Sequence, residues 1–92
     1  MRYEFKPCFH RSIKALSKDE KAEIKEACLA FLDLLDLRTK LPPGTGLKRL
    51  DNDYWEIRKG LRLRILFRWR KDSIDFILAG SHDSIKDFLK NS

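Results

Sequence analysis

Four arginines alternate with apolar residues in the segment LRLRILFRWR, which runs from Leu61 to Arg70. A period of two is the side-chain period of a β-strand, so one face of this strand would be apolar and the other basic. The guanidinium group stays charged at neutral pH, and its planar fork fits phosphate oxygens. The arginines are Arg62, Arg64, Arg68 and Arg70. Because they repel one another, we interpret this face as a polyanion-binding surface; a solvated sheet face is the alternative.

Other side chains capable of chemistry flank this segment. Lys48 and Arg49 form a basic pair after a loop rich in Pro and Gly, Lys40 precedes that loop, and Arg58 lies in the next apolar run. His82 follows the last apolar run, and an imidazole can accept or donate a proton near neutral pH. A histidine between a strand and a helix can equally help to cap the helix through its neighbours, so both interpretations remain open.

The net charge of +6 is concentrated in the middle of the chain. Residues 38–70 hold ten Lys or Arg against three Asp or Glu, whereas residues 1–37 hold seven of each kind. Residues 71–92 hold three basic and four acidic side chains. Localised basic charge is typical of a nucleic-acid binder. It could equally form the contact face for an acidic protein partner.

Several classes of protein are disfavoured by the composition. The two cysteines, Cys8 and Cys28, lack the spacing of a metal site, and we expect reduced thiols and no metal. No GxxxxGK[ST] or GxGxxG motif is present, so we expect no nucleotide cofactor. The segment Met1–Lys6 lacks the apolar centre of a signal peptide, and no apolar run is long enough for a membrane helix. We therefore expect a cytoplasmic protein without a membrane partner.

We interpret the N-terminal third of the chain as structural support for the site. A short strand at residues 3–5 is followed by apolar residues at helical spacing over residues 9–16. Ser17 and Glu20 form a capping-box pattern, which predicts a helix from about residue 18 to residue 37. These two helices would form a hairpin.

Three strands are predicted after the loop at residues 41–46. They cover residues 47–58, 61–70 and 74–79, and Ser81 or Asp83 would cap a short C-terminal helix. The predicted fold is a single α+β domain over residues 1–92, in the order β-α-α-β-β-β-α. Its sheet would be an antiparallel meander with helices packed mainly on one face.

This order of elements, together with the segment YWEIRKGLRLRILF, resembles the RelE/ParE superfamily of toxins from type II toxin–antitoxin modules. Members often carry the pattern Tyr/Trp-x-x-Arg-x-Gly, followed by Arg, two hydrophobic residues and an aromatic. Here the matching residues are Trp55, Arg58, Gly60, Arg64, Ile65, Leu66 and Phe67, with one extra residue after the glycine. The tail Gly80-Ser81-His82-Asp83 is similar to the branch whose active site uses histidines.

The resemblance implies a ribosome-dependent mRNA endonuclease that a cognate antitoxin inhibits. In such enzymes the RNA 2′-hydroxyl attacks the adjacent phosphate without a metal ion. Carried over, Arg64 would clamp the phosphate with Arg62 beside it, Lys48 and Arg49 would bind the backbone or assist proton transfer, and His82 would act as general acid or base. The further RNA-binding residues implied are Arg58, Arg68, Arg70 and Lys40. Ribosome, mRNA and antitoxin are the implied partners.

The chain departs from both catalytic patterns of the superfamily. The histidine branch usually carries further histidines in the middle third, and this chain has none there. The RelE-like branch ends in an arginine and a tyrosine, and neither occurs after Arg70. Two alternatives therefore stay open beside the nuclease: a ParE-like poison of DNA gyrase, which needs no acid–base residue, and a catalytically inactive basic nucleic-acid-binding domain of the same fold.

Overall fold

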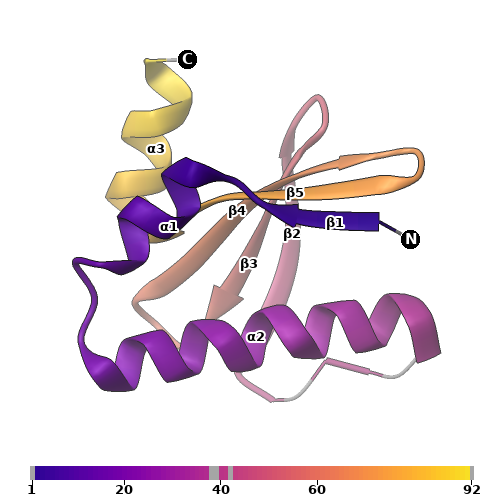
Figure 1. The fold of residues 1–92 in the computed structure, drawn as a ribbon, viewed down its shortest axis with the longest axis horizontal. Helices are drawn as coiled ribbons and strands as arrows, with labels where there is room; N and C mark the ends of the chain where they lie inside the picture. The colour runs from indigo at the N-terminus through magenta and orange to yellow at the C-terminus, as the bar shows by residue number, and fades with distance from the viewer. Residues whose placement is uncertain (1, 38–39, 42, 92) are drawn as a thin grey trace.

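The fold is a five-stranded mixed sheet with helices on both of its faces (Figure 1). We describe it in a computed structural model, which covers residues 2–37, 40–41 and 43–91. The strands are β1 (Arg2–Phe5), β2 (Thr45–Asp51), β3 (Tyr54–Lys59), β4 (Leu63–Arg70) and β5 (Ser73–Gly80); the helices are α1 (Pro7–Ile13), α2 (Lys18–Leu37) and α3 (His82–Lys90). Among the described helices, none is long and apolar enough to cross a membrane.

The strand order is β1-β5-β4-β3-β2. Strands β2 to β5 form the antiparallel meander that the sequence predicts, whereas β1 pairs in parallel with β5. The short β1 covers only the first half of the β5 edge, from Ser73 to Phe76. Helix α1 covers the rest, and its Ser12 hydroxyl accepts a hydrogen bond from the backbone N–H of Ala79 at 2.9 Å. This edge of the sheet is therefore closed by α1.

Helix α2 packs against one face of the sheet and builds the main core (Figure 1). Phe31 of α2 is fully buried and meets Phe67 of β4 with 4.7 Å between the ring centroids. Trp69 and Trp55 lie half-buried at the margin of this core, with 5.1 Å between their ring centroids. The alternation in β4 predicts this position for Trp69. Phe67 and Trp69 are two residues apart in β4, so their side chains lie on the same face of the sheet, which is the face of the main core.

The opposite face carries a second, smaller core, which corrects the expectation that the helices pack mainly on one face. Leu66 is fully buried there beneath α3, where it clusters with Ile77 of β5 and Ile85 of α3. The apolar side of α3 thus covers the middle of the sheet face that also bears Arg64 and Arg68. The reason is Leu66 itself, since a fully buried leucine stabilises a fold by about 2 kcal/mol and needs an apolar cover.

Two details of the predicted strands were wrong. Residues 47–58 do not form one strand: Asn52 adopts a positive φ of 49° in a tight turn, so β2 and β3 make a hairpin. The Asp-Asn-Asp run at residues 51–53 is a turn signal, because Asn tolerates this left-handed conformation. Leu61, expected in the core, is 94% exposed in the turn between β3 and β4. The α+β class is confirmed, with one strand more than predicted.

The predicted capping box at the start of α2 is confirmed. The N–H of Glu20 donates to the Ser17 hydroxyl at 3.1 Å, and the N–H of Ser17 donates to the Glu20 carboxylate at 2.9 Å. The backbone hydrogen bond from Ser17 lowers the pKa of the Glu20 carboxyl, and the Ser17 hydroxyl adds to this. A lowered pKa in the folded chain means that the stabilisation is present above the ordinary carboxyl pKa and is lost as the pH falls through the lowered value.

We predict that Ser17→Ala lowers the free energy of unfolding by about 1 kcal/mol at neutral pH, because the first turn of α2 loses its cap. Urea denaturation followed by circular dichroism measures the change. Ser17→Asp keeps an oxygen at the cap and should stay close to wild type. Equal stability of the alanine variant and wild type would show that the capping box contributes nothing.

Candidate nucleic-acid interface

Three cations and one carboxylate meet on the sheet face that α3 partly covers. In the strand register, Lys48 of β2 lies opposite Glu56 of β3, and Arg58 of β3 lies opposite Arg64 of β4. We call these four residues the Arg64 cluster. Arginines directly opposite each other repel, and Glu56 lies beside them as the only carboxylate of the cluster. The cluster is left with two positive charges in excess, which an anion can neutralise.

Glu56 holds Arg64 in a fixed position. Both side chains are largely buried, with 6% of Glu56 and 13% of Arg64 exposed. The Glu56 carboxylate lies 3.9 Å from Nε of Arg64, which is an ion pair too long for a hydrogen bond. Nη1 of Arg64 donates to the carbonyl oxygen of Leu63 at 2.9 Å. Nε and Nη2 make no hydrogen bond within the described part of the chain, and because Nε is buried, Nη2 is the guanidinium nitrogen left for an incoming phosphate oxygen.

The backbone of β2 makes room for Arg58. Gly46 lies opposite Arg58, and a Cβ atom at Gly46 would stand 3.4 Å from both Nε and Nη2 of that arginine. The guanidinium group therefore lies along the glycine backbone rather than over a side chain. Arg58 and Lys48 are exposed, so the cluster has two accessible cations beside the largely buried Arg64.

His82 lies at the same end of the sheet as Arg64. Gly80 of β5 pairs with Arg64, and His82 is the first residue of α3, two positions later. The helix cap is Ser81, whose hydroxyl accepts from the N–H of Ser84 at 3.1 Å, so His82 is not needed as a cap. The imidazole is 67% exposed, and Nδ1 lies 3.5 Å from a carboxylate oxygen of Asp83. The histidine is accessible to a substrate.

The other predicted site residues are dispersed. Arg49 points to the core face and donates from Nε to the carbonyl oxygen of Asn52 at 3.2 Å, so it does not pair with Lys48 as a site. Arg62 lies in the turn before β4 and lines a cleft with Glu20 of α2, and so does not continue the row of Arg64. Lys40 is exposed in the connection before β2. Arg38, which contributes to the basic middle third, lies outside the described residues.

Arg68 and Arg70 share the face of Arg64 but lie at the far end of β4. Arg70 forms an ion pair with Asp75 at 2.7 Å, and Arg68 approaches Asp53 at 3.5 Å. The guanidinium of Arg68 also lies over the Tyr54 ring, 5.5 Å from its centroid. These two arginines therefore belong to a second basic region, separated from the Arg64 cluster by the small core under α3.

Glu56 is the site residue that the sequence pattern did not reveal. Alternation in β3 places it on the same side as Tyr54 and Arg58, which suggests solvent exposure, yet the residue is buried. A lone carboxylate between two arginine-bearing strands was the available signal. Among the described residues, no group of three or more His, Cys, Asp or Glu is placed to hold a metal ion.

No protein-family model matches the sequence, and no curated protein is similar to it in sequence. The structure is similar to the RelB–RelE antitoxin–toxin complex from Methanococcus jannaschii, with a TM-score of 0.66, 22% identity, and coverage of 91% of this chain and 95% of that chain. For the DinJ–YafQ complex from Escherichia coli the TM-score is 0.67, with 14% identity and coverage of 92% and 98%.

A third similar structure comes from another organism. The RelBE2 toxin–antitoxin complex from Mycobacterium tuberculosis is similar with a TM-score of 0.63, 17% identity, and coverage of 88% of this chain and 96% of that chain. YafQ crystallised by itself also matches, with a TM-score of 0.65, so the similarity is to the toxin subunit. The chain has the RelE-like toxin fold. At these identities the likeness concerns the fold, and the activity has to be argued from the residues.

We predict that Glu56 and Arg64 are energetically coupled. In a double-mutant cycle of Glu56→Gln and Arg64→Gln, the coupling free energy should be about 1.5 kcal/mol, because both charges lie largely out of solvent. The matched control is the more exposed pair of Asp53 and Arg68, whose side chains are 48% and 36% exposed. Its cycle, Asp53→Asn with Arg68→Gln, should give about 0.5 kcal/mol or less. Chemical denaturation measures both cycles, and equal coupling in the two pairs would contradict a positioning role for Glu56.

Proposed function

We propose that this protein is the toxin of a type II toxin–antitoxin pair and that it cleaves mRNA on the ribosome. The observation that carries the proposal is the Arg64 cluster, in which an arginine fixed by a buried carboxylate stands beside two exposed cations on one sheet face. The RelE-like fold supports it, because the similar structures are described as toxins or toxin–antitoxin complexes.

The reaction would be attack of an RNA 2′-hydroxyl on the neighbouring phosphorus, with departure of the 5′-oxygen. Negative charge builds up on the phosphate in the transition state, and cations fixed in advance stabilise it most effectively. Arg64 is suited to this role because Glu56 and the Leu63 carbonyl oxygen hold its guanidinium in place. Lys48 and Arg58 would bind the flanking phosphates.

His82 is the candidate for proton transfer. It is exposed, carries an ionisable imidazole, and lies on the helix that begins just after the partner of Arg64 in β5. Glu56 is too deeply buried to reach a substrate hydroxyl, so it positions Arg64 and does not act as the base. In this proposal His82 gives the proton to the leaving oxygen or takes it from the attacking hydroxyl.

A poison that acts by binding is the second candidate. The Arg64 cluster contains no group that can accept a proton from a substrate hydroxyl, and among the described residues His82 is paired only with the exposed Asp83. A ParE-like protein that binds DNA gyrase needs no proton transfer. Under this alternative the cluster would be a contact surface, and His82 would be dispensable.

The partners follow from the same proposal. An antitoxin with an acidic segment could neutralise the Arg64 cluster and thereby inhibit either kind of toxin. The similar structures from Methanococcus jannaschii, Escherichia coli and Mycobacterium tuberculosis are complexes of a toxin with an antitoxin. The protein would act in the cytoplasm, where ribosomes and mRNA are found.

Induced expression in bacteria tests the proposal. Wild type should arrest growth, and primer extension on a translated mRNA should show new cleavages. Arg64→Ala should abolish both effects because the transition state loses its fixed cation, with a loss of rate on the order of a hundredfold or more. His82→Ala should slow cleavage by about a hundredfold. Lys90→Ala, an exposed lysine at the end of α3, is the control for expression and charge.

The outcomes separate the candidates. Arrest with cleavage that depends on Arg64 and His82 supports the nuclease. Arrest without cleavage, unchanged by His82→Ala and accompanied by DNA damage, supports the gyrase-directed poison. If soluble wild type causes no arrest, the toxin proposal is wrong and a basic binding domain remains.

A further inference from the structure

A second basic cleft opens at the other end of the sheet face that bears the Arg64 cluster. It has a volume of about 440 Å³. Its polar lining comes from three parts of the chain. These are the α1 region with Lys6 and Arg11, strand β3 with Tyr54, and the β4–β5 hairpin with Arg68, Arg70 and Asp75. We call it the Arg68 cleft. It carries four cations and one carboxylate. Two of the cations come from residues 1–37, a segment whose net charge is zero.

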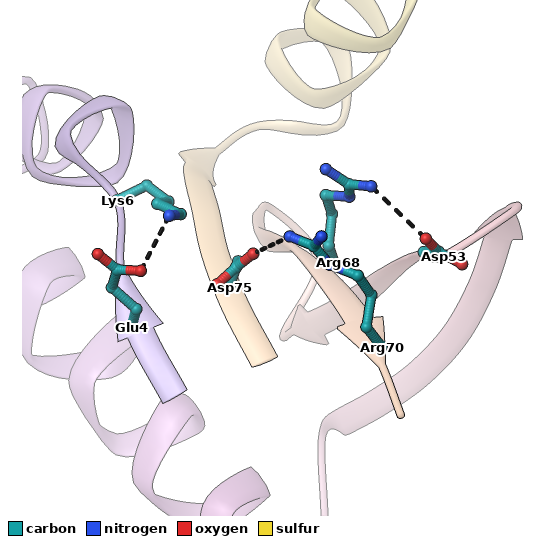
Figure 2. A network of polar contacts seen from close by, with 6 residues as sticks. All are labelled: Glu4, Lys6, Asp53, Arg68, Arg70 and Asp75. Carbon is teal, nitrogen blue, oxygen red and sulfur yellow. Dashed lines mark hydrogen bonds and ion pairs between the residues drawn. The ribbon is translucent and has the colours of Figure 1, made fainter. Parts of the chain in front are cut away.

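Contacts between side chains of neighbouring strands hold the floor of the Arg68 cleft. Asp75 is 8% exposed and binds Arg70 at 2.7 Å, which fixes that guanidinium beside β5. Arg68 lies over the Tyr54 ring. It also reaches Asp53 at 3.5 Å (Figure 2). Nε of Arg68 is buried without a hydrogen bond in the described part of the chain. These positions are set by the strands, so the cations are placed before any ligand arrives.

The remaining two cations come from the segment after β1. Lys6 binds Glu4 at 2.9 Å, and this hydrogen bond raises the pKa of Lys6, with Asp75 contributing in the same direction (Figure 2). Arg11 is exposed and pairs with no carboxylate among the described residues. Glu4 and Asp53, the two outer carboxylates, are 62% and 48% exposed. Exposed pairs of this kind contribute little, so a phosphate can replace these acids.

We infer that the Arg68 cleft binds the phosphodiester backbone of single-stranded RNA at a position separate from the Arg64 cluster. The inference rests on the proposed function in taking RNA as the ligand. Arginine forks suit phosphate oxygens, and an arginine stacked on a tyrosine offers a planar surface to a base. Tyr54 of the cleft and Arg58 of the cluster lie four residues apart on β3, or ~13 Å, with the small core under α3 between the two regions.

The test measures the affinity of a fluorescent 2′-O-methyl single-stranded RNA by anisotropy over a range of salt concentrations. The 2′-O-methyl group blocks cleavage, so binding is measured apart from catalysis. Arg11→Gln and Arg68→Gln should each weaken binding and make the slope of log affinity against log salt shallower by about 0.7. Lys25→Gln, an exposed lysine of α2 away from the cleft, should leave both quantities unchanged. Arg11 is exposed, so its substitution leaves the fold intact.

The outcomes distinguish this inference from the proposed function. If wild type binds RNA through Arg11 and Arg68 but does not cleave mRNA on ribosomes, the inference about the cleft stands and the nuclease proposal is wrong. If wild type cleaves mRNA but neither substitution changes the affinity or the salt slope, the inference about the cleft is wrong and the nuclease proposal stands. Tighter binding of poly-glutamate than of RNA, lost in Arg11→Gln and Arg68→Gln, would show that the cleft serves an acidic protein and would overturn the inference.

Discussion

The structure depends on the burial of both faces of β4. Ile65 and Phe67 enter the main core under α2, while Leu66 enters the small core under α3. A strand buried on both faces cannot shift its register by one residue without moving apolar side chains into the wrong layer. The arginines of β4 are therefore held at fixed positions by the apolar residues between them.

This constraint divides the basic face into two regions. Leu66 requires an apolar cover, and α3 provides it over the middle of the sheet. Arg64 remains at one end of β4 beside Glu56, and Arg68 and Arg70 remain at the other end beside Asp53 and Asp75. Each end combines cations with a carboxylate that orients at least one of them. The face is thus better described as two separate basic regions than as one basic strip.

The carboxylates also explain how so many arginines are tolerated on one face. Glu56 and Asp75 are both nearly buried, and a buried carboxylate without a cation would be costly. Each has an arginine close by, Arg64 in one case and Arg70 in the other. The cations left over, Lys48, Arg58 and Arg11, are exposed and can meet a ligand.

The sequence by itself determined the local features, because they depend on near neighbours in the chain. The capping box of Ser17 and Glu20, the long amphipathic α2 and the alternation in β4 all follow from short-range spacing. Only the tertiary structure decided which charges meet. Glu56 reaches Arg64 through strand pairing, Lys6 and Arg11 approach Arg68 through the parallel pairing of β1 with β5, and Arg62 leaves the row because the chain turns there. Lys6 and Arg11 are far from Arg68 in the chain, and Glu56 and Arg64 lie on different strands, so no periodicity within one segment encodes these contacts.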